Sequence, residues 1–391
     1  MNKTSSSAEE LAIYNCHIHT FTRKNVPRYI AKLQLGPVFG VMASWLESIP
    51  PLFRLITRFL AWIVPGKNDV LERIVRFVGT GKLQNQKAIF EKIQRQYPPG
   101  TKFIILPMNM HHMGDLGSVR EPIEIQHSDL LNLAQEVNDE RASCGKDEII
   151  FPFYTIHPEQ KDIDNIPADL DKIISQGKFR GIKIYPNLGY YPQNDKLMKV
   201  YALCEKGNIP VMTHCNPGGV WKYGLTREVR RNFADPKNYK IVLDQYPDLV
   251  LCLAHFGGTE EWIKRLQGRP ESSDKEEAWV KTIFDMIACG KYPNLYADIS
   301  YTLFQPKVKG LSIDLVDYLK VMLSNGRIRA RILFGSDYYM VEQEKISEKE
   351  MSILLRSRLG EDLYFQIAHY NPREYLGMER QKSKIKRPRR S

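Results

Sequence analysis

The sequence lacks several signals that assign chains to common protein classes. Its six cysteines, among 391 residues, show no pair at the spacing of a metal knuckle or a disulfide framework. It contains no Gly-x-Gly-x-x-Gly motif and no Walker loop. No internal repeat is visible, and low complexity is confined to the C-terminal residues. These absences disfavour a disulfide-stapled domain, an open Rossmann sheet and a repeat protein.

Apolar runs of the kind needed for export or for crossing a membrane are also missing. Residues Met1 to Glu10 are polar and lack the apolar core of a signal peptide. The stretch from Pro51 to Val64 contains Arg54 and Arg58 and follows Glu47, so charges interrupt the length that a bilayer span requires. We therefore expect a cytoplasmic protein with reduced thiols and no transmembrane segment.

The formal net charge of +11 is concentrated at the C-terminus. Residues after Glu379 include seven basic side chains and no acidic one, which leaves +4 on residues 1–379. A run of one charge sign is typical of a disordered tail. We interpret residues 378–391 as a basic tail that can contact acidic surfaces such as RNA or anionic lipid, with no clear sign of a nucleic-acid-binding domain.

Short apolar runs alternate with helical patterns along most of the chain. The eight runs typical of buried strands are Leu11–His19, Lys102–Met108, Glu148–Ile156, Gly181–Tyr185, Pro210–Thr213, Leu249–Ala254, Asn294–Asp298 and Arg331–Phe334. The helical patterns between them are Ser128–Asn138, Asp169–Gln176, Leu197–Lys206, Asn238–Tyr246, Lys275–Ala288 and Val316–Ser324. This alternation indicates parallel βαβ units, and eight units predict an α/β fold of the (β/α)8 TIM-barrel type over residues 11–377.

A helical insertion is expected after the first strand, over about residues 24–97. Arg54 and Arg58 lie four residues apart, so they share one helical face. A lid over a pocket, an oligomer interface and a membrane-surface helix are three open interpretations. We favour the first two, because the polar face is narrow for a membrane-surface helix.

Side chains with metal-binding chemistry occur in the strands that a barrel brings together, near the ends where catalytic groups of this fold lie. The candidates are His17 and His19 on the first strand, Lys183 on the fourth, His214 on the fifth, His255 on the sixth and Asp337 on the eighth. His17 and His19 are two residues apart and project to the same side of a strand. Each candidate alone has an ordinary structural explanation, such as a helix cap for the aspartate. Together they favour a site for zinc or a similar divalent ion.

These motifs resemble the amidohydrolase superfamily. The similarity is to its amidohydrolase-related branch, which includes aminocarboxymuconate-semialdehyde decarboxylase and the resorcylate decarboxylases. It spans nearly all of residues 11–377 and ends in Asn371-Pro-Arg-Glu-Tyr-Leu-Gly377, which is similar to the final helix of that branch. The insertion and the tail are covered least, and the motifs do not name a substrate.

The resemblance implies a set of site residues. Four positions match the ligands of one divalent metal, with zinc favoured: His17, His19, His214 and Asp337. The resemblance also implies catalytic roles for His255, as general base or electrophilic partner, and for Asp337, as a proton acceptor. In two-metal relatives a lysine at the position of Lys183 is carbamylated and bridges the ions. One metal with an unmodified lysine that binds a substrate carboxylate is the favoured alternative, and both stay open.

Aromatic and basic side chains on the expected mouth loops suggest substrate contacts. The candidates are Tyr185, Tyr190 and Trp221, with Lys183, Arg54 and Arg58 as partners of a carboxylate. Packing between loops explains many of the aromatic residues equally well. Asp298, at the end of the seventh strand, is expected to orient a neighbouring group.

We therefore expect a metal-dependent hydrolase of the amidohydrolase type. It would use metal-activated water on a C–N or C–O bond of a small, carboxylate-bearing molecule. Non-oxidative decarboxylation of an unsaturated or aromatic acid is the alternative at the same site. A non-catalytic barrel that binds RNA or membrane is the alternative of another class. A homo-oligomer, such as a dimer, is also expected.

Overall fold

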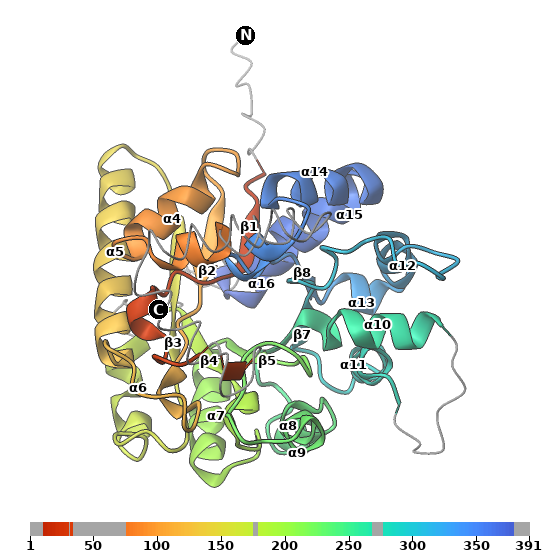
Figure 1. Ribbon diagram of the computed structural model, residues 1–391. Helices are drawn as coiled ribbons and strands as arrows, with labels where there is room; N and C mark the ends of the chain where they lie inside the picture. The colour runs from red at the N-terminus through yellow and green to blue at the C-terminus, as the bar shows by residue number, and fades with distance from the viewer. Residues whose placement is uncertain (1–10, 31, 34–75, 175–178, 268–276, 379–391) are drawn as a thin grey trace, which may run out of the picture.

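Eight parallel strands form one sheet in the order of the sequence. The computed structural model describes residues 11–30, 32–33, 76–174, 179–267 and 277–378 (Figure 1). The strands are β1 (Tyr14–Ile18), β2 (Lys102–Ile105), β3 (Ile150–Thr155), β4 (Gly181–Ile184), β5 (Val211–His214), β6 (Leu251–Ala254), β7 (Leu295–Asp298) and β8 (Ile332–Leu333). The Cys16 N–H donates to Phe334 O at 2.9 Å and the Asp337 N–H donates to His17 O at 2.8 Å. These bonds join the first strand to the chain around the last, so the predicted (β/α)8 barrel is confirmed.

Helices surround the strands on the outside of the barrel. They are α4 (Gln86–Gln94), α5 (Ile123–Ser143), α6 (Ile166–Ile174), α7 (Asp195–Gly207), α8 (Arg227–Ala234), α9 (Asn238–Gln245), α10 (Thr259–Leu266), α11 (Trp279–Ala288), α12 (Leu315–Met322), α13 (Gly326–Arg329), α14 (Glu348–Leu359), α15 (Glu361–Phe365) and α16 (Asn371–Tyr375). Short helices follow several strands, among them η2 (Met110–His112), η3 (Pro186–Leu188), η4 (His255–Gly257) and η5 (Met340–Gln343). Each helical pattern expected from the sequence overlaps one of these elements. Most of the expected insertion, including Arg54 and Arg58, and nearly all of the tail lie outside the described residues.

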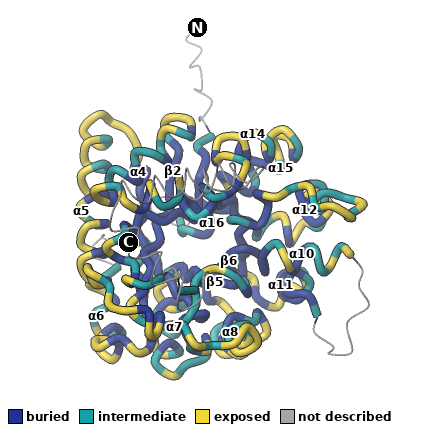
Figure 2. The backbone as a smooth tube through the Cα atoms, viewed as in Figure 1, coloured by how far each residue is buried: buried dark blue, intermediate teal, exposed yellow. Residues whose placement is uncertain are grey.

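The alternation of side chains along each strand creates two apolar cores. One core holds every second residue of the strands, such as Cys16, Met212 and Cys252, and is completed by Tyr375 of α16. The other core packs the remaining strand residues, such as Leu253, against the helices. Buried residues therefore lie at the centre of the molecule, and exposed residues lie on its outer helices (Figure 2). Solid apolar strand sequences follow from this burial on both faces.

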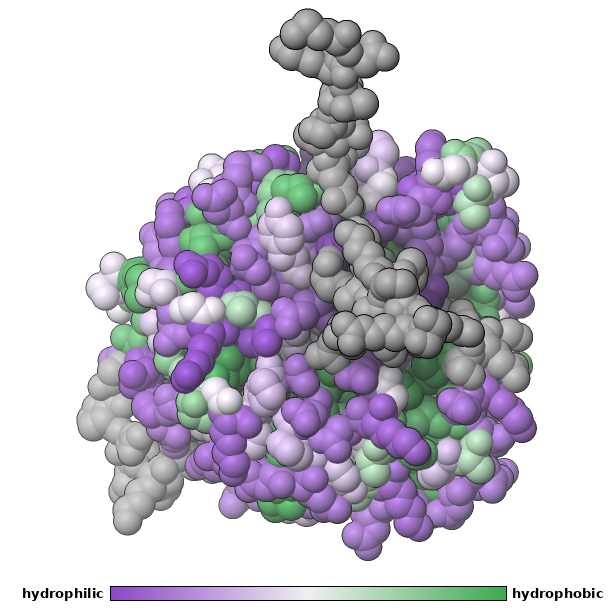
Figure 3. Space-filling view, turned by 180° about the vertical axis from the view of Figure 1, so that it is seen from behind, coloured by the Kyte–Doolittle hydropathy of each residue, from purple (hydrophilic) through white to green (hydrophobic). Residues whose placement is uncertain are grey.

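The surface agrees with this division. Seen from behind, the molecule presents mainly hydrophilic residues, with apolar ones in small groups (Figure 3). Among the described residues, no helix combines the length and the apolar character that a bilayer crossing requires.

The packed outer core predicts a large stability cost for truncation. Leu253 of β6 is fully buried, so Leu253→Ala should lower the free energy of unfolding by about 2–5 kcal/mol, measured by urea denaturation. Val321 of α12 is 59% exposed, so Val321→Ala should change it by less than about 0.5 kcal/mol. Equal effects of the two substitutions would contradict the assigned packing.

Candidate metal centre

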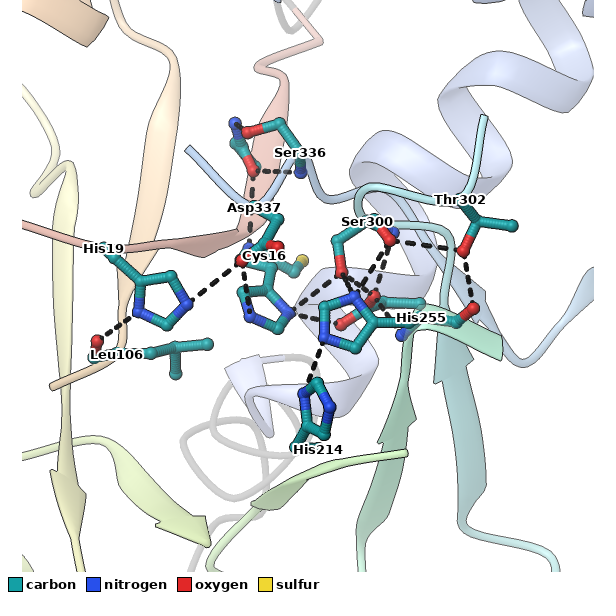
Figure 4. A network of polar contacts seen from close by, with 12 residues as sticks. Cys16, His19, Leu106, His214, His255, Ser300, Thr302, Ser336 and Asp337 are labelled. Atoms are coloured by element: carbon teal, nitrogen blue, oxygen red, sulfur yellow. Dashed lines mark hydrogen bonds and ion pairs between the residues drawn. The ribbon is translucent and has the colours of Figure 1, made fainter. Parts of the chain in front are cut away.

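Two imidazoles and one carboxylate converge where β1 meets the chain after β8. The Nε2 atom of His19 lies 3.1 Å from Asp337 Oδ1, and the Nε2 atom of His17 lies 3.5 Å from the same oxygen. All three side chains are buried. Figure 4 shows the His19 ring pointing toward Asp337, with its other nitrogen bonded to the Leu106 carbonyl. β1 and the chain that follows β1 and β8 thus bring together three donor atoms suited to one ion.

The hydrogen bonds of the two rings determine which nitrogen atoms carry protons. His19 Nδ1 lies 2.7 Å from Leu106 O, and His17 Nδ1 lies 2.9 Å from Asp298 Oδ2. Because these oxygens only accept, both Nδ1 atoms must donate, and in a neutral ring Nε2 keeps a lone pair. Both lone pairs then face a carboxylate oxygen, which is also an acceptor. These acceptors can meet only with a proton, on a ring or on the carboxyl group, or with a metal ion between them.

Burial disfavours the extra proton on His17. Burial, with a smaller contribution from the nearby Lys183, lowers the pKa of the His17 ring to about 3, despite the opposing effect of Asp298. A ring that stays neutral at pH 7 is the form that binds a metal. The donor set and its protonation therefore fit a divalent metal.

Asp298, at the end of β7, orients the histidines from behind. Its Oδ2 accepts from His17, and its Oδ1 accepts from the backbone N–H groups of His255 and Ser300, each at 2.9 Å. Burial alone would raise the pKa of Asp298, but its contacts with His17 and His255 lower it below the usual value. The carboxylate thus stays ionised and holds the His17 tautomer, the geometry expected for an orienting group.

His214 and His255 face each other beside this donor set. The His214 Nε2 atom lies 3.0 Å from the carbonyls of Asn216 and Gly218, and His255 Nδ1 lies 3.0 Å from Ser300 O. Those nitrogens must donate, which leaves His214 Nδ1 and His255 Nε2 as acceptors 3.0 Å apart. His214 therefore contacts His255, and His255 in turn lies beside His17, with ring centroids 4.9 Å apart. The atom that His214 can offer to a metal is Nδ1.

The loop after β5 holds His214 in place by close backbone approach. Gly219 has φ +88°, and an added Cβ would lie 3.0 Å from His214 Cε1 and would overlap the Tyr185 hydroxyl. Only glycine fits both the backbone angle and the space. The Tyr185 ring stacks on His214 with centroids 4.1 Å apart, and its hydroxyl accepts from the Val220 N–H. Tyr185 thus supports a candidate ligand.

Strained backbone accumulates at the same strand ends. Among the described non-glycine residues, five have positive φ, and four of them lie here: His255 (66°), Phe256 (45°), Tyr301 (60°) and Asp337 (68°). Such conformations cost about 1–3 kcal/mol each and persist where surrounding contacts enforce them, which is common at functional sites.

Lys183 of β4 is a buried cation without a bound partner. Its side chain is 1% exposed, and within the described part of the chain its Nζ atom makes no hydrogen bond. Burial lowers its pKa from 10.5 to about 8, although Asp298 and Asp337 oppose that shift. A buried amine that can be neutral or charged suits either a substrate carboxylate or modification by carbon dioxide, so both expectations for Lys183 stay predictions.

Two other residues expected to contact substrate are held by neighbouring protein groups. The Tyr190 hydroxyl accepts from the Tyr185 N–H at 2.6 Å, and its ring lies edge-on to His157. Trp221 is half-buried beneath the guanidinium of Arg230, whose Cζ lies 3.8 Å from the ring centroid. The substrate roles of Tyr190 and Trp221 stay predictions, as do those of Arg54 and Arg58.

The sequence interpretation missed a polar group on the loops after β2 and β3. His112, His157 and Glu159 come close enough to be considered for a metal. However, the two rings stack in parallel, with centroids 3.7 Å apart and planes 2° apart. Ring lone pairs lie in the ring plane, so parallel stacked rings do not aim at one ion. His157 follows strand β3, and this position at a strand end is the sequence feature that could have identified the group.

The fold and the candidate donor set fit the class of metal-dependent hydrolases and decarboxylases built on this barrel. A sequence profile of the amidohydrolase family matches residues 147–378. The match spans more than half of the chain, which therefore belongs to the amidohydrolase family, and the resemblance noted in the sequence is confirmed. This membership supports an enzyme over the non-catalytic alternative. No curated protein sequence matches the chain.

Solved structures share the fold at low sequence identity. An uncharacterized TIM-barrel protein from Bordetella bronchiseptica has a TM-score of 0.52 at 17% identity, covering 94% of this chain and 99% of its own. A probable 2-pyrone-4,6-dicarboxylic acid hydrolase from Acinetobacter baumannii has a TM-score of 0.51 at 12% identity, with coverages of 94% and 100%. A dihydroxybenzoic acid decarboxylase from a Polaromonas species, with bound manganese, has a TM-score of 0.50 at 14% identity, with coverages of 94% and 98%.

The environment of Lys183 predicts an unusual pH dependence of stability. Because the folded pKa lies near 8 and the unfolded value near 10.5, the unfolded state binds more protons between these values. The destabilisation caused by Lys183 is therefore full below pH 8 and fades as pH rises to 10.5. In metal-free protein, Lys183→Met should raise the free energy of unfolding at pH 7 and have less effect at pH 10. Chemical denaturation at both pH values measures this.

Lys199→Met provides the control, because Lys199 is exposed on α7 and the substitution should have little effect at either pH. A Lys183→Met protein with no gain at pH 7 would contradict the buried-cation assignment.

Proposed function

We propose that this protein is a metal-dependent hydrolase that cleaves a C–N or C–O bond in a small molecule bearing a carboxylate. The observation that carries the proposal is the convergence of two imidazole lone pairs and Asp337 Oδ1 on one buried point. Two neutral imidazoles with a carboxylate are a common ligand set for catalytic metals with open positions. Family membership supports the same chemistry.

His17, His19 and Asp337 would hold the ion, with His214 Nδ1 as the fourth candidate. When bound, a divalent ion supplies Lewis acidity and lowers the pKa of water toward neutrality. Zinc suits the nitrogen-rich donor set, and a single ion is favoured. Manganese is the ion bound in the Polaromonas decarboxylase of the same fold.

His255 is the residue best arranged to move a proton. Ser300 O holds its Nδ1–H, so Nε2 is the atom that can accept a proton from attacking water and return it to the leaving group. Asp337 can share this role, because its carboxylate lies beside the Nε2 atoms of His17 and His19, where the metal is proposed. Lys183 is close enough to Asp337 for their charges to interact, and within the described residues its ammonium group makes no hydrogen bond, which suits one carboxylate of the substrate.

Non-oxidative decarboxylation is the second candidate function at the same residues. The dihydroxybenzoic acid decarboxylase shares the fold, and the buried Lys183 ammonium would bind a substrate carboxylate in either reaction. The two reactions differ in the bond that breaks, not in the residues that hold the substrate.

The proposed metal site predicts the metal content of the purified protein. Protein purified without added metal should contain about one equivalent of zinc, manganese or iron per chain. His17→Ala should reduce this content by about tenfold or more, because a ligand is removed. His127 is equally buried on α5 but bonds to the Thr155 N–H, so His127→Ala should keep the metal. Elemental analysis of the three proteins decides the outcome.

Unchanged metal content in His17→Ala, or a metal-free wild type that binds none on titration, would refute the site. Intact-mass measurement adds a second result. A mass excess of one carbon dioxide that disappears in Lys183→Ala would replace the single-metal proposal with a bridged two-metal site.

The type of reaction is tested by its products. The protein should release an amine, alcohol or ring-opened acid from a panel of carboxylate-bearing amides, esters and lactones, without releasing carbon dioxide. Carbon dioxide release from unsaturated or aromatic acids, in the absence of oxygen and organic cofactors, would instead establish the second candidate. Product analysis by mass spectrometry distinguishes the two, and Asp337→Asn should abolish either activity.

A further inference from the structure

A buried asparagine links the two chain segments that carry the donor set. Asn15 lies two residues before His17 and is fully buried. Its Oδ1 accepts from the Ser336 N–H at 3.1 Å and from the His17 N–H at 3.3 Å. Its Nδ2 donates to the Ser336 hydroxyl at 2.8 Å and to the Tyr97 hydroxyl at 3.2 Å. One carboxamide thus makes four hydrogen bonds, two of them to Ser336, the residue that precedes Asp337, one to the His17 backbone and one to Tyr97.

The bonds to Ser336 lie next to Asp337, whose backbone is strained. Asp337 has φ +68°, a strained conformation for a residue with a side chain. The Asp337 N–H donates to His17 O, so both residues are joined directly as well as through Asn15. A register shift in the pairing of β1 with β2 also lies between Asn15 and Ile18. The donor geometry therefore depends on contacts outside regular strand pairing.

A second layer anchors the asparagine from the helix side. Tyr97 belongs to the core between the barrel and the helices, and its hydroxyl donates to Glu348 Oε2 at 2.7 Å. Glu348 begins α14 and is 2% exposed. Burial raises its pKa to about 8, so the carboxyl is mostly protonated at pH 7. The chain Glu348–Tyr97–Asn15 therefore adds little buried charge near Asn15 at pH 7.

We propose that Asn15 is a positioning residue that sets the separation of His17 and Asp337 for metal binding, an inference that rests on the proposed metal function. All four hydrogen bonds of its carboxamide go to protein groups, so it would contact neither substrate nor metal. Asparagine suits the task because its side chain accepts from two backbone N–H groups and donates to two hydroxyls at once. An aspartate could accept but could not donate, and an aliphatic residue could do neither.

Metal affinity measured with the full-length apoprotein tests the inference. Titration with Zn²⁺ against a chromophoric chelator should give an Asn15→Ala dissociation constant about 10- to 100-fold above that of the wild type, as is typical when a supporting partner is lost. Tyr97→Phe removes only the hydroxyl that anchors Asn15 and should give a smaller increase. The visible spectrum of the Co²⁺-loaded Asn15→Ala protein should also shift, because the ligand geometry changes.

Asn138→Ala is the matched control for a purely structural effect. Asn138 of α5 also holds backbone, with its Oδ1 accepting from Ile149 and Ile150 and its Nδ2 donating to Ile150, but at the start of β3, away from the donor set. It should lower the melting temperature yet keep the wild-type Zn²⁺ affinity and Co²⁺ spectrum.

The outcomes separate the two proposals. A wild type that binds Zn²⁺ while Asn15→Ala and Tyr97→Phe bind it equally well would overturn the positioning role alone. A wild type that binds no Zn²⁺ would overturn the proposed function, and this inference with it. If Asn15→Ala does not fold, the affinity of Tyr97→Phe decides.

Discussion

The structure depends on one electrostatic constraint: two imidazole nitrogens and a carboxylate oxygen, which are all acceptors when the rings are neutral, meet at one buried place. The Leu106 carbonyl accepts a hydrogen bond from His19 Nδ1, and the Asp298 carboxylate accepts one from His17 Nδ1. Only the Nε2 atoms of the two rings then remain to face Asp337. Burial makes a second proton on His17 costly. A bound cation would satisfy all three groups at once, and this is the basis of the function proposed for the strand ends.

The closed barrel is the reason that these groups can meet. His17 and Asp337 lie near opposite ends of the chain, and only the bonding of β1 to the chain around β8 makes them neighbours. Positive φ angles at Asp337 and His255 turn these side chains at the strand ends, and the surrounding hydrogen bonds enforce that backbone. The strained backbone and the buried Lys183 side chain both cost stability, and both lie at the site of the proposed chemistry.

Much of the fold and part of the site could be predicted from the sequence. The strands are continuous apolar runs, because each is buried on both faces, and their ends locate His17, His19, His214, His255 and Asp337. Asn15 and Ser300 could not be found in this way, because both are common residues whose partners depend on how the barrel closes. The pairing of His214 Nδ1 with His255 Nε2 also follows from carbonyl positions that no sequence pattern specifies.

The most direct test of this account is the position of the metal in a crystal of the full-length protein. Anomalous diffraction at the zinc or manganese edge should place one ion within bonding distance, about 2.0–2.2 Å, of His17 Nε2, His19 Nε2 and an Asp337 oxygen. An ion held elsewhere, or no anomalous peak at these side chains after soaking in the metal, would contradict the central claim.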